Sequence, residues 1–176
     1  MHRMEPHSPW PNGALLCGSG ITIAPTPKTT ILHLEAAHAV DALPAVGHTT
    51  TIPGADLLSI GPDVYWLLGH PENAVTFLAR FAVCLDMTDA WAGLRIGGSN
   101  AAALLAKGTA IDLDPRVFQT RRCATASFAQ LRTVLWRPSE GSDYELFVGR
   151  SYALSLWEWL VDAFAEYRVG NHNNER

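Results

Sequence analysis

The residues that could bind a metal ion or transfer protons are histidines, cysteines and acidic side chains, and their spacing decides what they can do. The chain has seven histidines, at His2, His7, His33, His38, His48, His70 and His172. A helical metal site needs two ligands on adjacent turns and a further ligand close by. No pair of these histidines has that spacing with a third ligand near it. The sequence therefore predicts no metal site.

A second candidate is a short stretch with two aspartates and a pair of glycines. Asp86 and Asp89 could form an acid–base pair, but Asp89 falls in a predicted turn, where aspartate is favoured for local hydrogen bonding. Gly97-Gly98-Ser99 lies between a predicted strand and a predicted helix, so its amide groups could hold an anion. It lacks the third glycine of a dinucleotide fingerprint and the lysine of a P-loop. We therefore expect a tight turn, with Ser99 as the N-cap of the helix.

Three cysteines are scattered along the chain, at Cys17, Cys84 and Cys123. An odd number without regular spacing indicates neither a disulfide framework nor a zinc site, and reduced thiols are typical of the cytosol. Cys84 and Cys123 fall on predicted apolar strands without an adjacent histidine, so we expect both to be buried structural thiols. None of these groups forms a constellation typical of an active site.

The elements that position these residues are best defined between residues 85 and 123. Apolar alternation predicts a strand that ends at Met87 and a second strand over residues 91–96, joined as a hairpin by Thr88 and Asp89. Residues 100–107 are rich in alanine and leucine, which favours a helix, and Gly108 ends it. Pro115 excludes a helix in the segment that follows.

The flanking segments divide the chain into an arm, one domain and a tail. Residues 1–28 have prolines at 6, 9, 11, 25 and 27 with several glycines, which predicts an irregular arm without helix or strand. Residues 169–176 form a polar tail, which leaves one domain over residues 29–168. Within it, strands are expected over residues 29–34, 49–52, 57–60, 64–68, 124–128, 133–136 and 144–148. Helices are expected from Pro71 to about Arg80 and after Ser151.

A weak repeat determines the predicted fold class. Strand, turn, strand, glycine and helix occur in this order three times, and the repeats end in the helices near residues 71–80, 100–107 and 151–167. Such units predict an α+β fold in which helices cover one face of an antiparallel or mixed sheet.

The last helix has the clearest sign of assembly with other chains. Its apolar residues recur at the helical period and predict one core-facing stripe. The stripe consists of Ala153, Leu156, Trp157, Leu160, Phe164 and Tyr167. Trp159 lies beside it, either as a cap on the rim of the core or as an anchor for another chain. Arg150 precedes the expected N-cap Ser151, where a cation is unfavourable. We therefore expect Arg150 and Trp159 to face another subunit.

Composition limits the class of protein. Of the 176 residues, 48% are apolar and 17% are charged. This is typical either of a large core or of an apolar surface that partners cover. A net charge of −4 gives no basic footprint for nucleic acid. The N-terminus lacks the apolar run of a signal peptide, and no segment approaches the length of a membrane span, so we expect a cytoplasmic protein.

Several motifs occur in an order typical of one family. They are LDMTDAWAGLRIGG (residues 85–98), LLAKGTAIDLDPRVF (104–118), RRCA (121–124) and YELFVGRSYALSLWEWLVDA (144–163). On these motifs, with the SIGPD run at residues 59–63 upstream, the chain resembles the gamma subunit of heterotetrameric sarcosine oxidase. Gly98 and Gly149 stand where the family pattern has proline.

This resemblance implies an accessory subunit with a reduced version of the folate-binding fold of aminomethyltransferases. It implies a complex in which the alpha subunit binds NAD and tetrahydrofolate and the beta subunit carries FAD and the substrate site. FMN would lie between alpha and beta, and the delta subunit would hold zinc. The complex would demethylate sarcosine or a related N-methyl amine oxidatively, with release of hydrogen peroxide and of methylenetetrahydrofolate or formaldehyde.

The same resemblance implies that this chain holds no cofactor and is not catalytic alone. It would support assembly with the alpha subunit. One alternative is a stand-alone folate-binding module, although a fold does not transfer a function. Another alternative is a small free-standing enzyme, which the lack of a catalytic constellation disfavours.

Overall fold

A computed structural model of the protein describes residues 8–36, 43–138 and 143–168. In these ranges the strands form two sheets, and every pairing is antiparallel. The first sheet has the order β1 (Leu16–Gly18), β2 (Ile21–Pro25), β8 (Trp91–Gly97), β11 (Tyr144–Gly149), β10 (Leu131–Arg137) and β9 (Arg122–Phe128). The second has the order β4 (Thr49–Ile52), β5 (Ala55–Gly61), β6 (Val64–Gly69), β3 (Ile31–Glu35) and β7 (Val83–Asp86).

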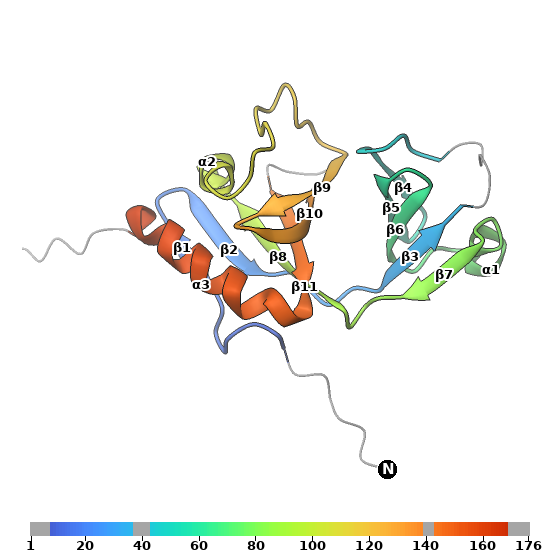
Figure 1. The fold of residues 1–176 in the computed structure, drawn as a ribbon, viewed down its shortest axis with the longest axis horizontal. Helices are drawn as coiled ribbons and strands as arrows, with labels where there is room; N and C mark the ends of the chain where they lie inside the picture. Colours follow the sequence, from blue (N-terminus) through green and yellow to red (C-terminus); the bar gives the residue numbers. More distant parts are fainter. Residues whose placement is uncertain (1–7, 37–42, 139–142, 169–176) are drawn as a thin grey trace, which may run out of the picture.

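Helices cover the outer faces of the two sheets (Figure 1). The helices α2 (Ala101–Ala106) and α3 (Ala153–Phe164) pack on the first sheet, and the short α1 (Ala74–Leu78) lies at the far end of the second. Two 3-10 turns, η1 (Arg150–Tyr152) and η2 (Ala165–Tyr167), flank α3. None of the helices in the described part of the chain is long and apolar enough to cross a membrane.

Three apolar clusters follow from the alternation of side chains along the strands. The first lies between the first sheet and its helices, and includes Leu94, Leu104 and Leu156. The second joins the two sheets, and the third lies between the second sheet and α1. The cluster between the sheets consists of Ile31, Leu58, Trp66, Leu68, Cys123, Val134, Trp136 and Phe147. Both sheets therefore share one core.

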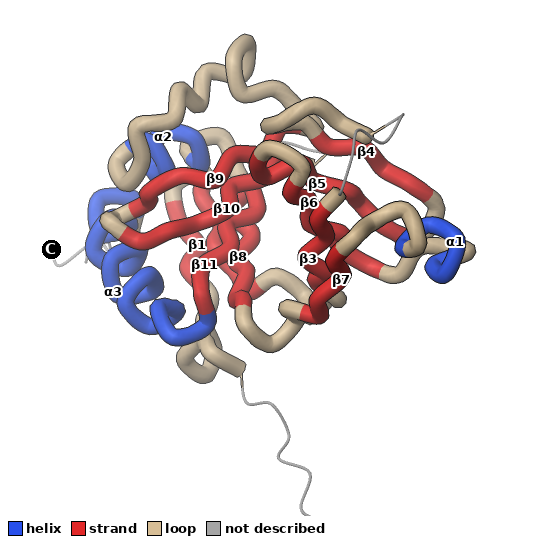
Figure 2. Tube along the Cα trace, turned by 45° about the vertical axis from the view of Figure 1, so that its right-hand side comes forward, coloured by secondary structure: helices blue, strands red, loops and turns tan. Residues whose placement is uncertain are grey.

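The chain passes from one sheet to the other twice (Figure 2). After β2 it enters the second sheet through residues 26–30, and after β7 it returns through residues 87–90. The predicted hairpin at residues 88–89 is therefore wrong, because β7 pairs with β3 whereas β8 pairs with β2 and β11. The amide of Ile31 donates to the hydroxyl of Thr88 at 3.1 Å, which holds this connection against the start of β3.

The prediction of an irregular arm is wrong for residues 16–25, which form β1 and β2. Ile21 and Ile23 are buried and alternate with polar or small residues, as expected for a strand that covers a core. The prolines are compatible with this arrangement because only Pro25 lies in a strand, as its last residue. Trp10 also packs into the first cluster.

The helices differ from the predictions at their starts. The helix expected from Pro71 begins only at Ala74, because Asn73 has a left-handed backbone conformation with a φ of +58°. The amides of His70 and Glu72 donate to the carbonyls of Gly54 and Pro53 in the turn between β4 and β5. Asn100 rather than Ser99 is the N-cap of α2, and no side chain caps this helix. The core stripe predicted for the last helix is confirmed for Ala153, Leu156, Trp157, Leu160 and Phe164, which are buried on α3. Tyr167, the sixth predicted member, lies in η2 and is only half-buried against the same cluster. The predicted tail at residues 169–176 lies outside the described residues.

Candidate functional site

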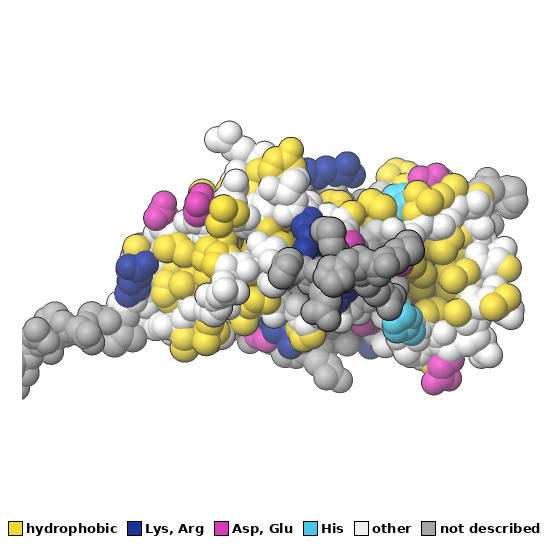
Figure 3. Space-filling view, turned by 90° about the horizontal axis from the view of Figure 1, so that it is seen from below, with side chains coloured by type: hydrophobic (Ala, Val, Ile, Leu, Met, Phe, Trp, Pro, Cys, Tyr) yellow, Lys and Arg dark blue, Asp and Glu magenta, His cyan; other side chains and the backbone are white. Residues whose placement is uncertain are grey.

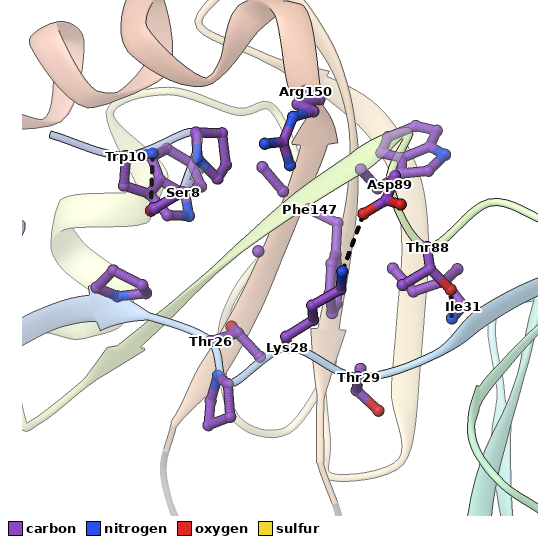
Figure 4. A pocket seen from close by; sticks show the side chains of 16 residues that line it. Ser8, Trp10, Thr26, Lys28, Thr29, Ile31, Thr88, Asp89, Phe147 and Arg150 are labelled. Atoms are coloured by element: carbon purple, nitrogen blue, oxygen red, sulfur yellow. Dashed lines mark hydrogen bonds and ion pairs between the residues drawn. The ribbon is translucent and has the colours of Figure 1, made fainter. Parts of the chain in front are cut away.

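A hollow of about 300 Å³ lies where the chain crosses between the sheets, and we call it the joint pocket (Figure 4). Its lining comprises residues 8–10, 25–29, 31, 88–89, 91–93, 147 and 150. It therefore includes parts of both connections, one residue from each side of the shared core, and the first residue of η1.

The walls of the joint pocket are largely aromatic. Trp10, Trp91 and Phe147 line it from three separate segments. Phe147 and Trp66 meet edge to face with ring centres 5.9 Å apart, and Trp66 and Trp91 do so at 4.5 Å. Trp10 packs against Trp157 of α3. The rings are therefore held by the cores on both sides of the first sheet.

The polar groups of the joint pocket come mainly from its rim. Lys28 and Asp89, one from each connection, form an ion pair at 3.1 Å, and both side chains are more than half exposed, so the pair contributes little to stability. Arg150 adds a second cation. The hydroxyl of Thr26 is buried and has no hydrogen-bond partner within the described residues. Figure 4 shows these side chains around one opening.

Arg150 lies in this pocket, half-buried, but the reason given for singling it out is wrong. The residue does not precede a Ser151 N-cap, since it is the first residue of η1 and the N-cap of α3 is Tyr152. Its amide donates to the carbonyl of Ala90 at 2.8 Å, which fixes the start of the last helical segment on the second connection.

Trp159 lies elsewhere, so the structure does not bring the two predicted interface residues to one site. It is half-buried and meets Phe128 edge to face, with ring centres 5.0 Å apart. It therefore packs on the rim of the first cluster. Whether its exposed edge also contacts another subunit stays a prediction.

The two aspartates considered as an acid–base pair have separate partners. Asp86 accepts a hydrogen bond from the amide of Thr88 at 2.9 Å, and hydrogen bonding by Thr88 lowers the pKa of this carboxyl. Asp89 pairs with Lys28. The two aspartates therefore do not share a proton-transfer site, and each side chain holds its own part of the connection in position.

The glycine pair forms a tight turn, as predicted. Gly98 has a φ of +102°, and a Cβ there would lie 2.2 Å from the carbonyl oxygen of Gly20. The side chain of Asn100 donates to the carbonyl of Ser19 at 2.7 Å and holds the same two turns together. The turn is therefore filled by the protein's own backbone.

The cysteines divide differently from the prediction. Cys123 is buried, and burial raises the pKa of its thiol to about 12. Cys84 is exposed, so the prediction that it is buried is wrong. It lies on β7, the edge strand of the second sheet, and local apolarity does not reveal that one side of an edge strand lacks a neighbour.

The histidines of the described chain have individual partners. His33 contacts Glu35, His70 contacts Thr30, and His48 lies against Arg122. The described residues include no group of three or more His, Cys, Asp or Glu side chains that could hold a metal ion.

Sequence reasoning missed an ion pair with a buried carboxylate and part of the joint pocket. Arg95 and Glu145 lie opposite each other on β8 and β11, with a 2.8 Å contact, and the Glu145 side chain is only 5% exposed. Their register is not visible before the strands are paired. Trp10 and Thr26 were missed because the segment was expected to be irregular, although the Ile-Thr-Ile run at residues 21–23 signals a strand.

Comparison with known proteins identifies the family. The model of the sarcosine oxidase, gamma subunit family matches residues 54–166, well over half of the chain. The chain belongs to this family. A relative named sarcosine oxidase subunit gamma, from Corynebacterium sp. (strain U-96), is 30% identical over 141 residues, which cover 76% of this chain and 68% of the relative. A protein of the same name from strain P-1 is 28% identical and is covered to 60% of its length.

The fold of this chain is similar to the folds of two solved structures. A chain of heterotetrameric sarcosine oxidase from Corynebacterium sp. U-96, in complex with pyrrole 2-carboxylate, superposes with a TM-score of 0.73 and 25% identity. The match covers 89% of this chain and 90% of that one. Aminomethyltransferase T of the Bartonella henselae glycine cleavage system superposes with a TM-score of 0.59 and 16% identity. That match covers 82% of this chain and 46% of the aminomethyltransferase chain. The predicted α+β class and the reduced aminomethyltransferase-like fold are thereby confirmed.

Proposed function

We propose that this chain is the gamma subunit of a heterotetrameric sarcosine oxidase-type complex, in which it supports assembly with the alpha subunit. The observation that carries the proposal is the superposition over 90% of a chain of heterotetrameric sarcosine oxidase, together with family membership. The joint pocket supports a binding role, because its aromatic side chains and Arg150 are residue types enriched at interfaces. The groups gathered there do not include a nucleophile with an adjacent base.

The complex carries its redox chemistry on other subunits in this proposal. NAD and tetrahydrofolate bind to alpha, FAD to beta, FMN between alpha and beta, and zinc to delta. The complex removes a methyl group from sarcosine or a related N-methyl amine, with hydrogen peroxide and methylenetetrahydrofolate or formaldehyde as products. The compartment is the cytoplasm, a choice that three unpaired cysteines, two of them exposed, support.

Exposed apolar side chains support the need for partners. Among the described residues, seven large apolar side chains are more than half exposed: Leu15, Val46, Val75, Leu85, Val117, Tyr152 and Leu154. Figure 3 shows apolar surface on both halves of the molecule. A lone subunit with such patches tends to associate non-specifically.

The experiment is affinity purification of the tagged full-length chain from its native cells. We expect it to bring down flavin-containing subunits in a fixed ratio, and we expect co-expression with alpha to raise the soluble yield. Recovery of a stable, monodisperse monomer without flavoprotein partners would contradict the proposal. Tetrahydrofolate bound tightly by that monomer would favour the stand-alone folate-binding module instead.

A further inference from the structure

We propose that three arginines near the start of β9 form a docking site for an acidic segment of a partner subunit. The three are Arg121, Arg122 and Arg137, and we call them the arginine cluster. An aspartate or glutamate side chain of the partner would bind to their guanidinium groups. This inference rests on the proposed function, since it names a surface through which the chain would join its complex.

Backbone pairing brings the three arginines together. Arg122 lies directly opposite Arg137 in the pairing of β9 with β10, and the amide of Arg121 donates to the carbonyl of Arg137 at 2.8 Å. Residues directly opposite each other share one face of a sheet, so two cationic side chains are neighbours here. Like charges in such a pair repel each other, and a bound carboxylate would relieve that repulsion.

The described contacts of the arginine cluster do not include a carboxylate. Nη1 of Arg122 lies against the ring of His48. Nη1 of Arg137 donates to the carbonyl of Phe118 at 2.7 Å, and its guanidinium lies over the ring of Tyr144, 5.4 Å from the ring centre. Within the described residues, no member of the cluster forms an ion pair. Its positive charge is therefore not neutralised by those residues.

Carboxylates of the adjoining segments are paired with other arginines. Glu145 follows Tyr144 in β11, but it accepts hydrogen bonds from Arg95 on the other side. Asp114, in the segment that leads to β9, accepts from Arg116. A surface with this excess of positive charge complements an acidic partner and repels a basic one.

The arginine cluster is built on a rigid part of the fold, where the two sheets meet. Figure 1 shows the segment before β4 beside the start of β9. The amide of Thr49 donates to the carbonyl of Arg121, and the amide of Cys123 donates to that of Gly47, each at 3.0 Å. Arg121 has a left-handed backbone with a φ of +62°, which a residue other than glycine keeps only where its surroundings fix it. Fixed elements reduce the entropy lost on binding.

Exposed apolar side chains beside the arginine cluster indicate that the occupant is a protein segment. Val117 is 54% exposed and precedes Phe118, whose carbonyl binds Arg137. Val46 is 55% exposed, and its carbonyl contacts the ring of His48 at 3.3 Å. Arginine next to exposed apolar surface is typical of protein–protein interfaces. A small inorganic anion would leave both valines in water.

Competition within the full complex tests the proposal. The wild-type chain and a variant, with different tags, are co-expressed with the partner subunits, and their ratio is measured in the purified complex. Arg121→Asn removes the guanidinium and suits a left-handed backbone, so its melting temperature should match that of the wild type. We expect its incorporation, and that of Arg122→Gln, to fall at least about tenfold relative to the wild type.

Arg132→Gln is the matched control for this competition. Arg132 is an exposed arginine of β10 that forms no ion pair with any described residue, so its loss should leave incorporation unchanged. If folded Arg121→Asn and Arg122→Gln chains enter the complex as well as the wild type does, the proposal is wrong. An equal loss in Arg132→Gln would also overturn it, because any arginine would then have the same effect.

Carbodiimide crosslinking identifies the class of occupant. Arg121→Lys keeps the positive charge and supplies a primary amine. The carbodiimide activates a carboxylate, the amine forms an amide bond with it, and the reagent leaves as its urea. We expect the product to join position 121 to an aspartate or glutamate of a partner subunit, whereas Arg132→Lys should not give this product. Linkage of position 121 only to a carboxylate of this chain would overturn the proposal.

Two further outcomes are distinguishable. Inorganic phosphate that raises the melting temperature of the wild type but not of Arg121→Asn, together with equal incorporation of both chains, would indicate a small-anion site in place of a docking site. If the wild-type chain enters no complex, this inference and the proposed function are both wrong. If the wild type and the cluster variants enter it equally, only this inference is wrong.

Discussion

Trp159 packs on the rim of the first cluster, and the prediction that it also contacts another subunit can be tested at the same residue. Its ring lies edge to face on Phe128, at a centre distance of 5.0 Å, on the rim of the first cluster. We expect Trp159→Ala to lower the free energy of unfolding by about 2 kcal/mol, because a half-buried aromatic contact is lost. Chemical denaturation of the isolated chain measures this change.

Trp159→Phe is the control, since it keeps an aromatic ring against Phe128 and should recover most of that stability. Affinity for the partner is measured on the same variants. If Trp159→Ala weakens assembly about thirtyfold and leaves stability intact, the rim contact is unimportant and the tryptophan is an interface anchor.

The cysteines give a second test at the residue scale. Burial raises the pKa of the Cys123 thiol to about 12, and its Sγ donates to the carbonyl of Ser59 at 3.3 Å. At pH 8 the reactive thiolate of Cys123 is therefore scarce, while Cys17 and Cys84 are exposed. We expect iodoacetamide to label the two exposed cysteines of the native chain and to label Cys123 only after denaturation.

Peptide mass spectrometry distinguishes the three positions in the isolated chain. Comparison with the assembled complex adds information, because protection of Cys17 or Cys84 on assembly would place a subunit over β1 or β7. Rapid labelling of Cys123 in the native chain would contradict the burial described for it.

The turn into α2 is the element whose backbone conformation is most demanding. Gly98 has a φ of +102°, which proline cannot adopt, so the proline typical of the family at this position would require a different turn. A Cβ at this position would also meet the carbonyl of Gly20 at 2.2 Å. We expect Gly98→Ala to lower the free energy of unfolding by about 3 kcal/mol, since both strain and a backbone clash result.

Gly61→Ala provides the comparison for that measurement. Gly61 is the last residue of β5, its φ is not positive, and its added Cβ would come no closer than 3.8 Å to Val64. The free energy of unfolding of Gly61→Ala should stay within about 1 kcal/mol of the wild-type value. Equal losses in the two variants would mean that the turn at Gly98 is not specially constrained.

At the scale of the whole molecule, the shared core ties the two sheets together. Trp66 from the second sheet packs on Phe147 from the first, at 5.9 Å between ring centres. At a second contact between the sheets, the amide of Thr49 donates to the carbonyl of Arg121, and the amide of Cys123 donates to the carbonyl of Gly47. We therefore expect the described chain to unfold as one cooperative unit, which includes β1 and β2 as well as the predicted domain over residues 29–168.

Urea unfolding followed by both far-ultraviolet circular dichroism and tryptophan fluorescence measures this cooperativity. Coincident transitions are expected, because tryptophans of the shared core report on both sheets. Two separated transitions would mean that the sheets are independent domains, and that the second sheet is an insertion with its own core.

The sequence by itself determined those strands and helices that short-range sequence patterns specify. Short runs of apolar and β-branched residues bounded by turn residues were sufficient for β4, β5, β6 and β9 to β11. The helical period likewise identified the buried face of α3. The ordered motifs in residues 85–163 were sufficient for the family, because such a series rarely recurs by chance.

Only the tertiary structure decided which strands are neighbours. The same residues 87–90 could close a hairpin or cross between sheets, and the hydrogen bond between Ile31 and Thr88, 57 positions apart, favours the crossing. Burial of Ile21 and Ile23 depends on β8, and exposure of Cys84 depends on the missing neighbour of β7. The joint pocket also arises from segments distant in sequence. Long-range pairing of this kind cannot be seen in any local window of the chain, because its free energy comes from contacts that exist only after folding.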